Sequence, residues 1–193
     1  VATQRLGGMT DEPEPSRAEV SDVATAVIVG ADCVMLSEET ASGEYPIEAV
    51  TTMKKIILYT EDHPALAVSF PDNEDHSRQA SISRAVVALA ENIEAQAIVV
   101  ETKSGATALQ IASIRNSIPL IAVTSDGRTV DQLALVYGVK SYLRPVDAHA
   151  ASKLTDWLRK SKLLNKGDIV VTASGRHPGV VGTTDTIKVR VLE

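Results

Sequence analysis

A short stretch of the sequence, TKSGAT at positions 102–107, gathers groups that suit a phosphate ligand. Its hydroxyl groups and its ammonium group donate hydrogen bonds, and its glycine lets the backbone come close to a bound anion. If a helix begins there, the free N–H groups of its first turn add further donors. The candidate phosphate ligands are Thr102, Lys103, Ser104, Gly105 and Thr107.

An ordinary helix cap would account for the same residues. The hydroxyl of Thr102 or Ser104 would then satisfy the first amides of the helix, and Lys103 would be solvated. The stretch is neither a P-loop nor a dinucleotide-binding fingerprint. The loop residues alone therefore leave a ligand and a cap as equal alternatives.

The loop follows a predicted strand in a region where strand and helix patterns alternate. The runs QAIVV, PLIAV and DIVVT are short, continuous and rich in β-branched residues, which is typical of parallel strands covered on both faces. Helical patterns, beginning with ISRAVVALAENI, stand before and between them. The loop would then lie at the carboxyl end of a parallel strand, where open α/β sheets bind their ligands.

The final run, TIKVRVL, has a different pattern. Three β-branched residues alternate with Lys188 and Arg190, as expected of a half-exposed strand at the edge of a sheet, which can run antiparallel. Residues 71–193 are therefore predicted to form a three-layer α/β/α domain around a mostly parallel sheet of about five strands.

Residues 1–65 are predicted to form a separate part. RAEVSDVATAVIVG predicts a helix, ADCVML predicts a buried strand, and YPIEAVTTMKKIILYT predicts a second helix with Pro46 in its first turn. The only cysteine, Cys33, falls in the predicted strand and is expected to be a buried small hydrophobe. Residues 61–78 combine two prolines with a cluster of charges, which indicates a linker and a domain boundary near residue 70.

Composition narrows the classes of partner. The chain has 193 residues, of which 44% are hydrophobic and 23% charged, as in soluble globular proteins. Its formal net charge of −6 argues against nucleic acid and anionic membranes as partners. No apolar run reaches the roughly 18 residues of a membrane span, and a single cysteine suits a reducing compartment, so a cytoplasmic location is expected. The four histidines form no spaced ligand pairs, so neither a metal nor another cofactor is expected in this chain.

Several longer segments resemble pyruvate kinases, in the same order along the chain. The block from Pro15 to Val50 is the most specific, because helix, strand and loop motifs agree within it, whereas the TKSG loop alone would be a weak match. The matching segments are ATQ at 2–4, PSRAEVSDVATAVIVGADCVMLSEETASGEYPIEAV at 15–50, TKSGATA at 102–108, KGDIVVTASG at 166–175 and GTTDTIKV at 182–189. The resemblance implies that 1–65 corresponds to the last β/α units of a (β/α)8 catalytic barrel and that 71–193 corresponds to the family's C-terminal allosteric and oligomerisation domain.

The resemblance also implies a phosphorylated effector. In the family this domain binds a sugar phosphate or a nucleotide, and the TKSG loop holds one phosphate group. The five candidate ligands would hold it here, and Arg176 in the loop SGRHPGVVGTT would be a second anion ligand unless it is a solvated loop cation. A helix that holds a second phosphate in some relatives cannot be matched residue by residue to the segment around Trp157, so the identity of the effector stays open.

For catalysis the resemblance implies little in this chain. Pyruvate kinases transfer a phosphoryl group from phosphoenolpyruvate to ADP with magnesium and potassium, using a lysine and two metal-binding carboxylates on earlier barrel strands. Only Thr3, Ser37 and Glu39 match active-site residues here, and without the resemblance they would be a terminal residue and polar caps. Arg17 matches an arginine at a subunit interface. The chain alone is expected to be inactive.

Three functions remain compatible with the sequence. The chain can be the effector-binding part of a pyruvate kinase, a stand-alone effector-binding module, or a structural module in which the TKSG loop is only a cap. Departures from the family pattern near the amino terminus, at Gly7, Gly8, Glu14 and Glu38, put the local barrel geometry in doubt. Because an incomplete barrel exposes apolar faces, a homo-dimer or homo-tetramer is expected.

Overall fold

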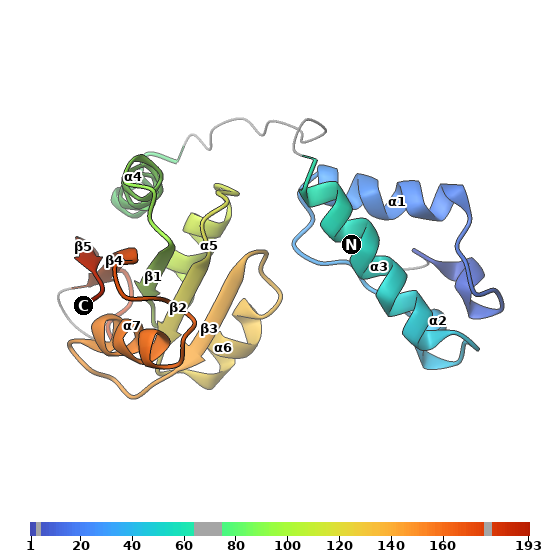
Figure 1. Cartoon of the computed structure of the whole chain (residues 1–193). Coiled ribbons are helices and arrows are strands. Elements are labelled where there is room, and N and C mark those ends of the chain that lie inside the picture. Colours follow the sequence, from blue (N-terminus) through green and yellow to red (C-terminus); the bar gives the residue numbers. More distant parts are fainter. Residues whose placement is uncertain (3–4, 64–74, 176–178) are drawn as a thin grey trace. The chain divides into compact units, whose positions relative to one another are not determined.

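The computed structural model describes residues 1–2, 5–63, 75–175 and 179–193 (Figure 1). The chain forms two compact units, Val1–Asp72 and Asn73–Glu193. The boundary predicted near residue 70 lies in 64–74, outside the described residues. Each unit has its own buried core, so each is described by itself.

The first unit is built from helices and connecting loops. Its elements are η1 (Gly7–Thr10), α1 (Arg17–Ile28), α2 (Glu38–Ala41) and α3 (Pro46–Glu61). The two longer helices confirm the sequence predictions, and α3 begins at the proline whose fixed φ suits a first helical turn. The buried core between them consists of Leu6, Met9, Val23, Ala49 and Met53.

A capping box fixes the start of α1 and ties it to η1. The hydroxyl of Ser16 accepts a hydrogen bond from the Glu19 amide at 3.3 Å, and the Glu19 carboxylate accepts one from the Ser16 amide at 2.8 Å. The same carboxylate accepts a hydrogen bond from the Gly8 amide at 2.5 Å. Burial alone would raise the pKa of Glu19, but these hydrogen bonds outweigh it and hold the pKa below its usual range.

The strand predicted at 31–36 is not formed in the structure, and this prediction is wrong. The segment makes two backbone hydrogen bonds to the first residue: the Val1 amino group donates to the Cys33 carbonyl at 2.7 Å, and the Met35 amide donates to the Val1 carbonyl at 3.0 Å. A parallel strand needs a ladder of such bonds along its length, and two bonds to a single residue do not build it. Among the described residues no sheet includes this segment, and Cys33 is exposed rather than buried.

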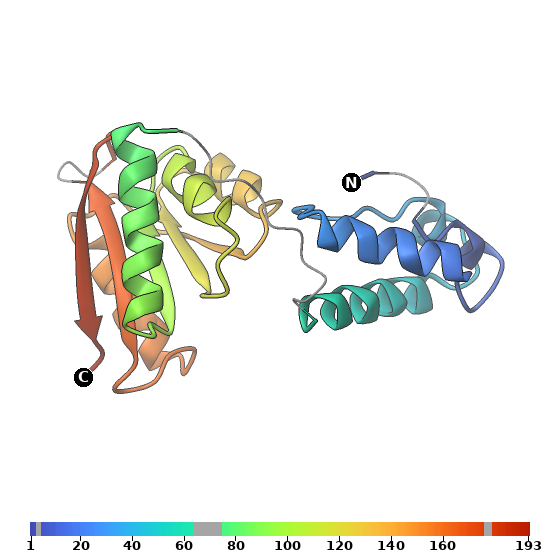
Figure 2. The ribbon, with the colours of Figure 1, turned by 90° about the horizontal axis from the view of Figure 1, so that it is seen from above.

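The second unit contains a five-stranded sheet with the strand order β3-β2-β1-β4-β5 (Figures 1 and 2). β1, β2, β3 and β4 pair in parallel, and β5 pairs antiparallel with β4. The strands are β1 (Ala97–Glu101), β2 (Leu120–Thr124), β3 (Val139–Leu143), β4 (Ile169–Gly175) and β5 (Thr184–Val191). The helices are α4 (Arg78–Asn92), α5 (Ala106–Ala112), α6 (Gly127–Leu133) and α7 (Ala150–Lys160).

Helices cover both faces of this sheet. The core on one face joins α4, α5 and α6 to side chains of the inner strands, including Ile98 and Val100. The core on the other face joins α7 to Ala97 and Val99, the alternate residues of β1. The three-layer α/β/α architecture, the mostly parallel five-stranded sheet and the antiparallel edge strand β5 therefore confirm the predicted fold class. The TKSG loop follows β1, the central strand.

Candidate functional site

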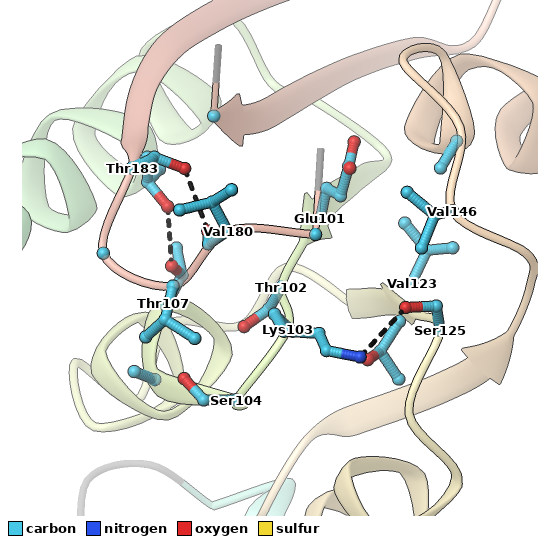
Figure 3. Close-up of a pocket in the computed structure, with 18 of the residues that line it drawn as sticks. Glu101, Thr102, Lys103, Ser104, Thr107, Val123, Ser125, Val146, Val180 and Thr183 are labelled. Carbon is cyan, nitrogen blue, oxygen red and sulfur yellow. Dashed lines mark hydrogen bonds between the residues drawn. The ribbon is translucent and has the colours of Figure 1, made fainter. Parts of the chain in front are cut away.

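A pocket lies at the carboxyl ends of the parallel strands of the second unit (Figure 3). Three of its sides come from the ends of β1, β2 and β3 and the loops that follow them, and Gly175 and residues 179–184, between and at the ends of β4 and β5, form the fourth. Its lining residues are Gln79 and residues within 101–107, 123–125, 144–150, 175 and 179–184. The position agrees with the general location of ligand sites in open α/β sheets.

The turn that begins with Thr102 holds the loop in shape. Thr102 is buried, and its hydroxyl accepts a hydrogen bond from the Gly105 amide at 3.0 Å. The loop is also fixed from the side, because the Thr129 hydroxyl donates to the Lys103 carbonyl at 2.9 Å. Gly105 has φ +82°, and an added Cβ would lie 3.4 Å from a methyl group of Leu133. Thr102 therefore fixes the turn before α5, whose N-cap residue is Gly105 and which has no side-chain capping hydrogen bond, and the backbone geometry at 105 favours glycine.

Lys103 and Ser104 are the loop residues whose side chains this turn does not use. Both line the pocket, and the Ser104 side chain is exposed (Figure 3). The Lys103 ammonium lies 3.4 Å from the hydroxyl of Ser125 and 3.9 Å from a carboxylate oxygen of Asp126, and its side chain is 35% exposed. These long contacts across the ends of β1 and β2 leave the ammonium close to the pocket and accessible to an anion.

Thr107 also lines the pocket, but its hydroxyl is already engaged. It lies 2.9 Å from the hydroxyl of Thr184 and accepts a hydrogen bond from the Gln79 side-chain amide at 3.3 Å. The residue thus joins α5 to the start of β5 and to α4. Of the predicted phosphate ligands, Gly105 shapes the turn without lining the pocket, and Arg176 lies outside the described residues.

The sequence analysis missed three charged residues of this pocket: Glu101, Arg144 and Asp147. Glu101 is the last residue of β1, and burial together with the nearby charge of Asp147 raises the pKa of its carboxyl group. The Arg144 guanidinium lies over the ring of Trp157, with its Cζ atom 5.0 Å from the ring centroid. Trp157 packs edge-on against Tyr142, 5.5 Å between centroids, at the outer edge of the sheet. The sequence signal that could have identified these three residues was their position, since each lies within four residues of the carboxyl end of a strand.

Of the predicted site residues of the first unit, Glu39 is engaged by the backbone. Glu39 is 1% exposed, and its two carboxylate oxygens accept hydrogen bonds from the backbone amides of Leu6, at 3.2 Å, and Ser37, at 2.6 Å. Ser37 precedes α2 without a side-chain capping hydrogen bond. Arg17 is exposed at the start of α1, and Thr3 lies outside the described residues. Glu39 therefore joins two loops of the unit by anchoring their amides.

Two further findings apply to the described part of the chain. It contains no group of three or more histidine, cysteine, aspartate or glutamate side chains arranged to hold a metal ion. None of its helices has the length and apolar character that a membrane crossing requires.

Comparison with known proteins gives consistent matches over both units. The model of the pyruvate kinase α/β domain matches residues 80–190, and the model of the pyruvate kinase barrel domain matches residues 1–50. The chain is 40% identical over 198 residues to pyruvate kinase 2 of Synechocystis sp., covering 100% of this chain and 33% of that protein. It is 38% identical to a pyruvate kinase of Mycobacterium intracellulare, covering 98% of this chain and 40% of the relative.

A pyruvate kinase of Clostridium acetobutylicum gives a similar result, with 37% identity over 198 residues, 100% of this chain and 42% of the relative. The chain thus spans between 33% and 42% of the length of these curated relatives.

Proposed function

Since this chain belongs to the pyruvate kinase family, we propose that its second unit is an effector-binding domain that takes up a phosphorylated small molecule in the strand-end pocket. The molecule would be a sugar phosphate or a nucleotide, as the family resemblance implies. The enzyme to which the domain contributes would transfer a phosphoryl group from phosphoenolpyruvate to ADP in glycolysis.

The observation that carries this proposal is the presence of Lys103 and Ser104 in a pocket built from four segments. The Thr102 hydroxyl fixes the turn by accepting a hydrogen bond from the Gly105 amide, and α5 begins without a side-chain cap. The turn does not need an ammonium group at the pocket wall. Charge-assisted hydrogen bonds from lysine and a hydroxyl are suited to phosphate oxygens, which supports a ligand in addition to the structural role of the turn.

Replacing Lys103 with glutamate is expected to weaken binding of a phosphorylated ligand by about 1–3 kcal/mol, because an attractive charge becomes a repulsive one. Isothermal titration calorimetry with inorganic phosphate, sugar phosphates and nucleotides measures this loss. Lys103→Met, which removes the charge without reversing it, should give a smaller loss in the same direction. Lys166→Glu is the matched control, because Lys166 is exposed in the turn before β4, at the other end of the strands. Unchanged affinity of Lys103→Glu for all these ligands would contradict the proposal and favour the cap alone.

For catalysis, we propose that this chain on its own does not turn over phosphoenolpyruvate. Enzymes of this family use magnesium and potassium, and phosphoryl transfer depends on metal ions that neutralise the phosphates. The described residues do not fit such a site, because both carboxylate oxygens of Glu39 are engaged by backbone amides. No catalytic step is therefore assigned to the residues of the first unit.

A coupled assay of ADP-dependent pyruvate formation, run at high concentration of the purified chain with magnesium and potassium, is expected to give the rate of a buffer blank. The physical reason is that an active site without several of its catalytic groups keeps only a small fraction of its activity. A rate above the blank that persists in Glu39→Gln would show that other residues carry out the reaction.

Assembly into a homo-dimer or homo-tetramer, and a cytoplasmic location, are part of the same proposal. Support for assembly comes from the exposed apolar side chains of α3, of which Ile47, Tyr59 and Val50 are at least half exposed. Large apolar side chains on one helix are typical of surfaces that a partner covers. The alternative function, a stand-alone module that only binds an effector or only assembles, shares this fold and differs in the outcome of the ligand titration.

A further inference from the structure

We infer that Glu101 makes this pocket selective for ligands with a single phosphate group and with hydroxyl or amine donors at their other end, and that it discriminates against bisphosphates. The inference rests on the proposed function, because it assigns a second contact to the same ligand. It concerns a residue outside the TKSG loop.

Glu101 stands where β1 enters the pocket. Successive residues of a strand point to opposite faces, and Ala97 and Val99 belong to the core under α7, so Glu101 points to that same face. In Figure 3 its carboxylate lies between Val180 and Val146, on the side of the pocket away from Ser104. A ligand held at Lys103 and Ser104 would therefore extend its other end toward Glu101.

The Glu101 carboxylate has unused capacity for hydrogen bonds. Its side chain is half-buried and has no hydrogen bond or ion pair among the described residues. Burial and the negative charge of Asp147 both raise the pKa of its carboxyl group, and no ion pair to Glu101 is found among the described residues. An uncompensated acceptor in a pocket wall is satisfied by a ligand that brings a donor.

The other charged residues that line the described part of the pocket have partners of their own. Asp147 pairs with the Lys153 ammonium and accepts a hydrogen bond from the His149 amide at 2.8 Å; the hydrogen bond from Lys153 is the main reason that the pKa of Asp147 lies below its usual range. Arg144 lies over the ring of Trp157. The Lys103 ammonium lies 3.9 Å from a carboxylate oxygen of Asp126.

Charge then decides which ligands fit. A second phosphate near Glu101 would meet a half-buried carboxylate, where like charges are screened less than in bulk water and repel each other. A hydroxyl or an amine at the same place would donate a hydrogen bond to a charged acceptor, which is stronger than a bond between neutral groups. The pocket should thus accept a hexose monophosphate and disfavour the corresponding bisphosphate.

The test compares the intact chain with Glu101→Gln, which keeps the shape and the acceptor oxygen but removes the charge. Isothermal titration calorimetry is run with three probes: inorganic phosphate, a hexose monophosphate and a hexose bisphosphate. Glu91→Gln serves as the matched control, because Glu91 is exposed near the end of α4, before β1 begins. It removes the same charge at the opposite end of that strand.

We expect the Glu101→Gln substitution to raise affinity for the bisphosphate about tenfold and to leave affinity for the monophosphate unchanged or lower, so that the preference shifts by about tenfold or more. Glu91→Gln should leave the preference as it is. If inorganic phosphate and the monophosphate bind but Glu101→Gln behaves like Glu91→Gln, this inference is overturned and the phosphate site stands. If none of the three probes binds the intact chain, both the inference and the proposed function are overturned.

Discussion

Replacing Glu39 with alanine is expected to lower the free energy of unfolding of the first unit by about 2–4 kcal/mol, because two backbone amides lose a charged acceptor inside the protein. The side chain is almost fully buried, and its oxygens accept hydrogen bonds from Leu6 and Ser37. Alanine supplies no acceptor and leaves a cavity beside the core residue Leu6. Glu39→Gln, which keeps one acceptor oxygen, should lose less.

The measurement can separate the two units. The only tryptophan of the chain, Trp157, lies in the second unit, so its fluorescence follows that unit during chemical denaturation, while far-ultraviolet circular dichroism follows the helices of both units. Glu39→Ala should move part of the dichroism transition to lower denaturant and leave the fluorescence transition in place. Glu38→Ala is the matched control, since Glu38 is the exposed neighbour with the same charge. Equal transitions in the two variants would refute the anchoring role of Glu39.

Replacing Gly175 with valine is expected to destabilise the second unit by about 3 kcal/mol and to weaken ligand binding as well. A Cβ added at Gly175 would lie 2.8 Å from the carbonyl oxygen of Thr183, which is backbone and cannot turn aside. The chain between β4 and β5 would have to shift, at the position where the register of the two strands is already irregular. Thr184, which bonds to Thr107 under the pocket, would shift with it.

Gly127→Val tests whether the effect is specific to the contact. Gly127 is the first residue of α6, and an added Cβ there would meet nothing within 4 Å. Thermal unfolding followed by Trp157 fluorescence should show a large decrease in the transition temperature for Gly175→Val and a small one for Gly127→Val. Similar transition temperatures for both would mean that the chain at Gly175 can relax without cost.

The sequence predicted most of the second unit because its inner strands are covered on both faces. Such strands are continuous apolar runs, and β1, β2 and β4 all have this composition. β3 was not predicted individually, because its residues VKSYL mix polar and apolar types at an exposed edge. The strand predicted at 31–36 was wrong for a different reason. Its sequence is apolar enough for a buried strand, but among the described residues no sheet forms around it.

The candidate site was predictable only in part for a related reason. The TKSG loop is contiguous in the sequence, so its hydroxyl groups and its lysine could be recognised together. Glu101 looked like an ordinary strand end, and Arg144 follows the strand that was not predicted. Their proximity depends on the strand order, which brings segments more than forty positions apart to one edge of the sheet. The two roles of the loop, with Thr102 fixing the turn and Lys103 at the pocket, depend on side-chain hydrogen bonds that composition does not reveal.

The place of β1 in the strand order has a consequence for how a ligand would enter. Lys103 and Glu101 are attached to the central strand, whereas the walls at 144–147 and 179–184 adjoin the two edge strands, β3 and β5. Edge strands open locally at a lower free energy than central ones, and their amides exchange with solvent hydrogen sooner. We therefore expect the charged residues that would recognise the ligand to exchange more slowly than the pocket walls beside the two edge strands. Entry and release would proceed by transient opening at the two edges, while the recognition geometry stays formed throughout.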